Sequence, residues 1–221
     1  RARKRKMDDP DAPLIVGVDP AGAGGDKFAV AWRRGDKCIK IKYRHRLEHD
    51  AAVAWITSII DEDKPSRVCI DRGSMGNNIL SSIRALNPKY ASVMKGVDFG
   101  GRSQAKQANP DRTGPVNRRA EIYGRLKEWL PDASIPDDDD VASDLASPRV
   151  KYRANNDWML ESKVEIKQRI GRSPDLGDAL ALTFATQEFF QDWSKPEKPK
   201  GFSAGEPKVI YLDQRNKQPS T

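Results

Sequence analysis

Three aspartates in this chain fall at places where a protein could hold metal ions for phosphodiester chemistry. Asp19 follows the apolar run of residues 14–18, and Asp71 ends a second apolar run at residues 67–70, whereas Asp178 lies in a segment with a helical pattern. A carboxylate at the carboxyl end of a buried strand points out of the core. Two such strands and a helix therefore predict a cage of oxygen ligands for Mg²⁺ or Mn²⁺. Such ions can drive phosphodiester cleavage with little further help from the protein.

The segments that must position these acids alternate between strand and helix patterns. Short runs rich in apolar and β-branched residues predict strands at residues 14–18, 27–33, 37–43, 67–70 and 92–97. Helical spacing of apolar residues predicts helices at residues 50–60, 77–86, 117–130, 137–146, 158–170 and 173–190. A hairpin turn at residues 34–36 joins the second and third strands, so the chain should open with an antiparallel meander.

Two of the expected helices carry start signals. The four aspartates of residues 137–140 suit a helix start, where the dipole favours negative charge, better than a metal site. Ser173 suits an N-cap, followed by Pro174 at the first helical position.

The order of elements predicts an α/β fold of the RNase H-like plan. Its mixed five-stranded sheet consists of an antiparallel meander followed by parallel strands, flanked by helices. In that plan the first strand is central and the fourth lies parallel beside it. Asp19 and Asp71 would then end adjacent strands, and the ligand site would lie at the carboxyl ends of the strands.

The composition allows one domain with tails. The 221 residues carry a net charge of +7, which suits a nucleic-acid partner and equally an ordinary basic protein. A basic tail or linker is expected at residues 1–13 and a flexible tail at residues 193–221, around one domain at residues 14–192. The basic cluster at the N-terminus either touches phosphates or links to a further domain. No apolar stretch is long enough to span a membrane, and Cys38 and Cys69 are expected to be reduced.

Four motifs in order carry a resemblance to a known family. They are residues 16–22 around Asp19, 70–76 around Asp71, 117–126, and 171–182 around Asp178. Together they resemble the C-terminal nuclease domain of the large terminase subunit of tailed bacteriophages, over residues 14–190. The resemblance implies a metal-dependent endonuclease that cuts concatemeric viral DNA during genome packaging. It would work in the host cytoplasm and be absent from the mature virion. Its partners would be double-stranded DNA, the terminase ATPase domain, the small terminase subunit and the portal.

The resemblance also assigns the site residues. It implies that Asp19, Asp71 and Asp178 are catalytic and hold two Mg²⁺ or Mn²⁺ ions, with Asp19 bridging them. Asp175 is either a fourth ligand or an acid near a helix start. No Walker A phosphate loop is present, so the motor domain and an ATP site are not expected in this chain.

Basic side chains near these motifs are candidates for DNA contacts. The candidates are Arg102, Lys106, Arg112, Arg118, Lys163 and Lys167, each of which could instead be an ordinary solvated side chain. Arg119 either joins this cluster or merely flanks a helix. An RNase H-like Holliday-junction resolvase would use the same acids and stays the main alternative. A sugar kinase would need a second phosphate loop, and a non-enzymatic DNA-binding module would have no use for the acids.

Overall fold

The computed structural model describes residues 1–6, 10–21, 25–73 and 75–186. Its main sheet has the strand order β3-β2-β1-β4-β5. These strands are β1 (Leu14–Asp19), β2 (Lys27–Arg34), β3 (Lys37–His45), β4 (Arg67–Asp71) and β5 (Met94–Val97). β1, β2 and β3 pair antiparallel, whereas β4 lies parallel to β1 and β5 parallel to β4. The predicted mixed five-stranded sheet is therefore confirmed, with β1 in its centre.

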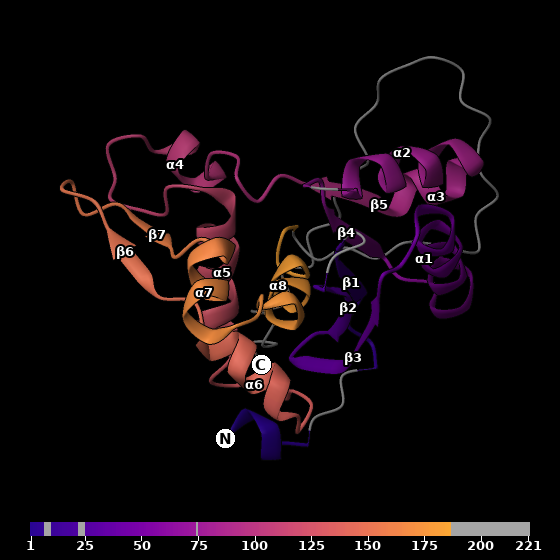
Figure 1. The fold of residues 1–221 in the computed structure, drawn as a ribbon, viewed down its shortest axis with the longest axis horizontal. Helices are drawn as coiled ribbons and strands as arrows, with labels where there is room; N and C mark the ends of the chain where they lie inside the picture. The colour runs from indigo at the N-terminus through magenta and orange to yellow at the C-terminus, as the bar shows by residue number, and fades with distance from the viewer. Residues whose placement is uncertain (7–9, 22–24, 74, 187–221) are drawn as a thin grey trace, which may run out of the picture.

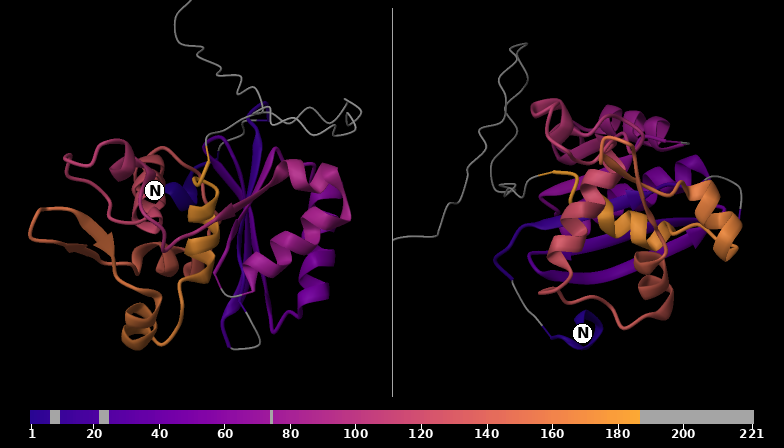
Figure 2. Two further views of the ribbon diagram at one scale, coloured as in Figure 1. Left: turned by 90° about the horizontal axis from the view of Figure 1, so that it is seen from above. Right: turned by 90° about the vertical axis from the view of Figure 1, so that its left-hand side faces the viewer.

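Alternating side chains of β1 face two different layers. Val16 and Val18 pack into the core beneath α1 (His49–Asp63), α2 (Gly76–Leu86) and α3 (Pro88–Val93). Ile15 faces the other core, which is covered by α8 (Asp175–Leu182). Figure 2 shows α1 to α3 on one side of the sheet and α8 on the other. Burial on both faces explains why β1 and β4 read as continuous apolar runs.

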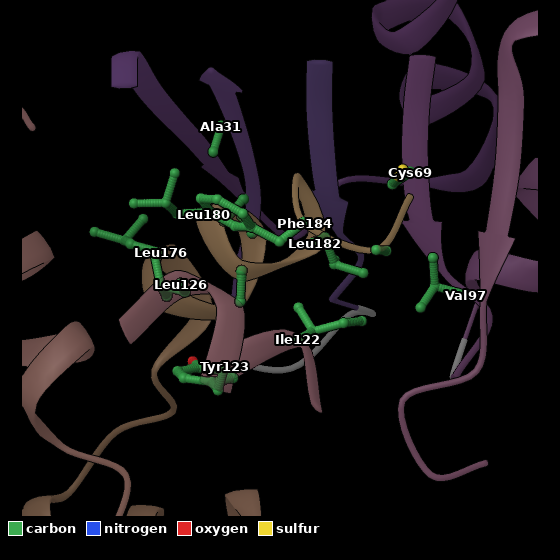
Figure 3. Packing of buried hydrophobic residues seen from close by; sticks show 14 of the residues in the cluster. Ala31, Cys69, Val97, Ile122, Tyr123, Leu126, Leu176, Leu180, Leu182 and Phe184 are labelled. Atoms are coloured by element: carbon green, nitrogen blue, oxygen red, sulfur yellow. The ribbon is translucent and has the colours of Figure 1, made fainter. Parts of the chain in front are cut away.

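A further group of elements lies beyond α8, on the side away from the sheet (Figure 1). They are α4 (Gln104–Ala108), α5 (Arg118–Trp129), α6 (Asp139–Ala146), β6 (Val150–Tyr152), β7 (Trp158–Leu160) and α7 (Lys163–Ile170). α5 packs on α8 through Ile122, Tyr123 and Leu126, which meet the leucines of α8 in Figure 3. α8 is thus enclosed between the sheet and α5.

Some expected boundaries are wrong. Residues 158–160 form a strand paired with β6, and the helix starts only at Lys163. The cause is a capping box in which Ser162 and Glu165 satisfy each other's backbone amides. The last helix begins at Asp175 without a side-chain cap from Ser173, and it ends at Leu182. The part of the expected helix at residues 187–190 lies outside the described residues.

Other helix starts agree with expectation. Asp138 caps α6 by accepting the Val141 amide at 3.0 Å, so the aspartate run is a helix start as predicted. Asn117 caps α5 by accepting the Ala120 amide at 2.9 Å.

The beginning of the chain contacts the domain. A 3-10 turn, η1 (Ala2–Lys4), places Ala2 against the core, and the Ser134 hydroxyl donates to the Arg5 carbonyl at 2.6 Å. These residues of the expected tail therefore pack, although the boundary at residue 14 stays a prediction. The expected tail at residues 193–221 lies outside the described residues. Among the described helices, none combines the length and the apolar character that crossing a membrane requires.

Gly17 sets how closely α8 approaches the central strand. A Cβ atom at this position would lie 2.0 Å from the Ala179 carbonyl oxygen and 3.1 Å from the Thr183 nitrogen. Only a residue without a side chain leaves room for this backbone contact. The close approach brings Asp178 on α8 next to the end of β1.

We expect Gly17→Ala to lower the free energy of unfolding by about 3 kcal/mol, because α8 must move away from β1. Urea unfolding followed by circular dichroism measures this change. The control is Gly25→Ala, because a Cβ there meets nothing within 4 Å. Equal stability of the two variants would show that α8 tolerates a wider separation from the sheet.

Candidate active site

The predicted acids converge on one edge of the sheet. Asp19 ends β1 and Asp71 ends β4, directly after the paired residues Val18 and Ile70. Asp178 lies in the first turn of α8, above this edge. Asp19 is 2% exposed and Asp178 is 0% exposed, so two carboxylates are buried together.

A cavity of about 490 Å³ opens at this edge of the sheet. Asp19, Asp71 and Asp175 line it together with Lys163 and Arg119. Asp175 is 4% exposed and accepts the Lys27 backbone amide at 2.8 Å. The structure thus places the possible fourth acid at the cavity wall, in the first turn of α8.

Lys163 sits between two of these carboxylates. Its Nζ donates to Asp19 Oδ1 at 2.9 Å and Oδ2 at 2.8 Å, and it lies 3.1 Å from Asp178 Oδ2. The capping box that starts α7 makes Lys163 the first residue of that helix. This lysine is one of the candidates for a DNA contact, and in the structure its ammonium pairs with two of the acids.

The other oxygen of Asp178 is held from α5. Oδ1 accepts Arg119 Nε at 3.1 Å, Arg119 Nη2 at 3.0 Å and the Tyr123 hydroxyl at 2.7 Å. Arg119 also donates from Nη1 to the Glu161 carbonyl at 2.9 Å. From the sequence the role of Arg119 stays open, and nothing there singles out Tyr123. Their spacing of four residues, on one face of a helix, was the available signal.

The surroundings shift the pKa values of Asp19 and Asp178 in opposite directions. Burial works to raise the pKa of Asp178, but Arg119, Lys163 and Tyr123 outweigh it and hold that pKa below its ordinary value. Burial raises the pKa of Asp19 to about 8, with Lys163 opposing the shift and Asp178 and Asp175 adding to it. Burial also lowers the pKa of Lys163, but the Asp178 and Asp19 carboxylates outweigh it and keep the ammonium charged.

For Asp71 and Asp175, too, burial raises the pKa while hydrogen bonds from backbone amides lower it. Burial raises the pKa of Asp71, against backbone amides that include Phe99 N, 3.5 Å from Oδ1. Burial likewise raises the pKa of Asp175, against the Lys27 amide. Carboxylates crowded in this way favour a bound cation.

The donor set suits a hard divalent cation, although it is not gathered around one point. All four acids offer carboxylate oxygens, the ligands that Mg²⁺ and Mn²⁺ prefer. Asp178 Oδ2 is buried and accepts no well-oriented hydrogen bond. Within the described ranges, however, no three His, Cys, Asp or Glu side chains are arranged to hold a metal ion. The Lys163 ammonium occupies the space between Asp19 and Asp178.

The remaining basic candidates do not form one surface cluster. Arg102 and Arg112 are exposed, whereas Lys106 pairs with Asp157 at 2.9 Å and Lys167 with Asp26 at 2.7 Å. Arg118 lies inside the domain, which corrects its expected place at the surface. Its guanidinium donates to Glu121 at 2.6 Å and to the Ala185 carbonyl.

Replacing Lys163 with Met should leave the Asp19 and Asp178 carboxylates without their shared counter-charge. We expect the free energy of unfolding in EDTA to fall by roughly 2 to 4 kcal/mol, because the buried ion pairs lose one partner. The deficit should grow as the pH rises above about 8, because Asp19 then releases its proton in the unaltered chain, whereas without Lys163 it does so only at a higher pH.

Urea titrations at several pH values test this expectation. The matched control is Lys167→Met on the same helix, because its pair with Asp26 is exposed and contributes at most about 1 kcal/mol. Equal losses in both variants would mean that Lys163 acts as an ordinary surface cation.

Comparisons with known proteins identify solved structures that share this fold. No family model matches the chain, and no curated protein matches it. Among solved structures, the nuclease domain of the large terminase subunit gp2 of bacterial virus Sf6 has a TM-score of 0.62 and 22% identity. That match covers 78% of this chain and 87% of the viral domain.

Metal-bound structures match as well. A point mutant of the Sf6 nuclease domain with manganese has a TM-score of 0.64 and 20% identity, covering 80% of this chain and 89% of that one. The large terminase nuclease from thermophilic phage G20c with bound magnesium has a TM-score of 0.55 and 14% identity, covering 80% and 82%. The chain therefore has the fold of the nuclease domain of phage large terminase subunits, as its four motifs predict.

Proposed function

We propose that the chain is a divalent-metal-dependent DNA endonuclease, the nuclease domain of a terminase large subunit that cuts concatemeric viral DNA during packaging. The observation that carries the proposal is that Asp19, Asp71 and Asp175 line one cavity where two parallel strands end, with the buried Asp178 behind Lys163 at the same edge. The similar Sf6 and G20c domains are named as terminase nucleases, and two of them hold manganese or magnesium, which supports it. The natural partners are then double-stranded DNA, the ATPase domain, the small subunit and the portal, in the host cytoplasm.

Asp19, Asp71 and Asp178 are the residues that would hold two Mg²⁺ or Mn²⁺ ions, with Asp175 beside them. When bound, such ions lower the pKa of a water molecule and stabilise the leaving oxygen of a phosphodiester. The chain's own part is to fix the acids. Arg119 and Tyr123 occupy Asp178 Oδ1, which leaves Oδ2 next to the Lys163 ammonium.

Lys163 has a different part in this proposal. Its ammonium keeps Asp19 and Asp178 compatible with burial before a metal ion arrives. Its side chain is 35% exposed, so the ammonium has room to reach solvent or a DNA phosphate if the carboxylates hold an ion instead. A DNA contact by Lys163 would belong to this second position.

Cleavage of supercoiled plasmid in Mn²⁺, Mg²⁺ or EDTA tests the proposed activity. We expect nicking and linearisation with either ion, none in EDTA, and loss to the EDTA background in Asp178→Asn, because a ligand oxygen is removed. Asp140→Asn is the matched control, since Asp140 is an exposed acid on α6. Circular dichroism confirms that both variants are folded.

Two further measurements, a four-way-junction substrate and calorimetric Mn²⁺ binding, distinguish the proposal from its alternatives. Cleavage that persists in EDTA or in Asp178→Asn would contradict the proposal. Preference for a four-way junction over plain duplex would favour a junction resolvase. If the folded chain cuts nothing, calorimetric Mn²⁺ binding that disappears in Asp19→Ala would still support the site, and no Mn²⁺ binding would refute it.

Tyr123→Phe tests whether the groups behind Asp178 position it. Losing the 2.7 Å hydrogen bond frees Oδ1 to rotate, so we expect Mn²⁺ affinity and cleavage rate to fall about 10- to 100-fold, the usual effect of outer-shell partners. Tyr90→Phe is the control, because Tyr90 bonds the exposed Asp61 away from the site. Unchanged Mn²⁺ affinity in Tyr123→Phe would show that Arg119 alone suffices.

A further inference from the structure

The helix that carries two of the four acids starts without a cap of its own. α8 begins at Asp175, and the side chain of its N-cap residue, Pro174, accepts no hydrogen bond. The first amides of an α-helix have no partner within the helix. Leu176 and Gly177 are buried, so their amides need acceptors from elsewhere in the fold.

The acceptor is Asp144, a buried residue in the last turn of α6. Its Oδ2 accepts the Leu176 amide at 2.9 Å, and its Oδ1 accepts the Arg172 guanidinium. Asp144 is 0% exposed, so its carboxylate is enclosed. Burial raises the pKa of this carboxyl to about 6, although Arg172 and the amides of Leu176 and Gly177 lower it. The group is therefore charged at about pH 7.5.

Gly177 lets α6 approach the start of α8 closely enough for this hydrogen bond. A Cβ atom on Gly177 would lie 3.1 Å from the Asp144 carbonyl carbon and 3.2 Å from the Asp144 Cβ. In the second half of α8, Gly17 permits the contact between that helix and β1. Backbone contacts with β1 and with α6 thus position α8 from two elements.

The amides that face Asp144 belong to residues between the two acids of α8. Leu176 and Gly177 follow Asp175 and precede Asp178, so Asp144 holds the turn from which both acids project. Metal ligands must be held within about 0.5 Å of their working geometry. A shift of this one turn would move both carboxylates together.

α6 is itself anchored at the end that carries Asp144. Arg169 on α7 donates from Nη2 to the carbonyl of Ser147, the residue that ends α6, at 2.6 Å. The same guanidinium pairs with Glu161 at 2.6 Å. The last turn of α6 is therefore fixed to its neighbours and gives Asp144 a firm support.

We infer that Asp144 is a positioning residue of the metal site, which fixes the first turn of α8 so that Asp175 and Asp178 keep the geometry that a divalent ion requires. The inference rests on the proposed function and adds a residue that acts through the helix. Outer partners of this kind hold metal ligands in place, and losing one typically lowers metal affinity 10- to 100-fold.

A buried carboxylate paired with an arginine also has a purely structural role. It can join two parts of a fold without any effect on a metal ion. That role depends on the charge that Asp144 offers to Arg172, whereas the positioning role depends on an acceptor oxygen at the Leu176 amide. Variants that remove the charge with and without the acceptor therefore distinguish the two roles.

Asp144→Ala and Asp144→Asn form this pair of variants. Both remove the same negative charge, but only Asn keeps an oxygen for the Leu176 amide, and Asn caps helices about as well as Asp. Mn²⁺ binding to the full chain is measured by calorimetry at about pH 7.5. We expect Asp144→Ala to bind Mn²⁺ about tenfold or more weakly, and Asp144→Asn to stay within about threefold of the unaltered chain.

Asp138→Ala is the matched control. Asp138 caps α6 by accepting the Val141 amide at 3.0 Å, so this variant also removes one charge and one capping hydrogen bond. Its Mn²⁺ affinity should equal that of the unaltered chain. Plasmid cleavage by Asp144→Ala should fall at limiting Mn²⁺ and recover at saturating Mn²⁺, because all four acids are still present. Urea unfolding measures the stability of each variant separately.

A second pair of variants applies if Asp144→Ala does not fold. Asp144→Ala/Arg172→Met and Asp144→Asn/Arg172→Met leave no unpaired cation, and replacing both partners of a buried ion pair often costs little stability. The same difference in Mn²⁺ affinity, about tenfold, is expected between these two.

The outcomes are separable. Unchanged Mn²⁺ affinity in folded Asp144→Ala, with lower stability alone, would overturn the inference and leave Asp144 a structural residue. Equal losses in Asp144→Ala and Asp144→Asn would overturn it as well, because the charge and not the hydrogen bond would then matter. If the unaltered chain neither binds Mn²⁺ nor cleaves plasmid, the proposed function fails first. If it does both and Asp144→Ala binds Mn²⁺ equally well, the assignment of Asp144 alone fails.

Discussion

Two buried carboxylates constrain the rest of this structure. Asp19 and Asp178 lie almost without solvent at the point where the central strand meets α8. Unpaired charges at such a position would cost several kcal/mol each. The chain therefore has to bring cations to them, and it does so from two helices, with Lys163 from α7 and Arg119 from α5. Both helices lie beyond α8 and carry these cations toward it.

Packing and charge reinforce each other at α8. Gly17 lets the helix lie directly on β1, and this close approach brings Asp178 to the end of the strand that carries Asp19. On the opposite side of α8, Tyr123 contributes its ring to the apolar core and its hydroxyl to Asp178. A single helix is thus fixed by a backbone contact on one side and by a hydrogen-bonded carboxylate on the other.

The sequence was sufficient for the sheet and for where the strand-end acids lie, because both depend on local patterns. Apolar runs ending in Asp19 and Asp71 indicate buried strands that end in carboxylates, and the order of elements indicates which strands are neighbours. The cations that pair with the acids could not be found in this way. Arg118 and Arg119 are adjacent and chemically identical, yet one pairs with Glu121 three residues away and the other with Asp178 on another helix. Long-range packing makes that difference, and a single sequence does not record it.

The two cations next to Asp178 are not equivalent. Arg119 is enclosed, with a side chain 9% exposed, and each of its three guanidinium nitrogens donates to Asp178 or to the Glu161 carbonyl. Removing it would leave Asp178 Oδ1 with the Tyr123 hydroxyl as its one remaining hydrogen-bond donor among the described residues, so Arg119 is part of the structure itself. Lys163 is 35% exposed and is held by the acids alone, at the first turn of a helix. An ion held by Asp19 and Asp178, as proposed, would supply the charge that Lys163 supplies here. Of the two cations, Lys163 is therefore the one whose place such an ion would take.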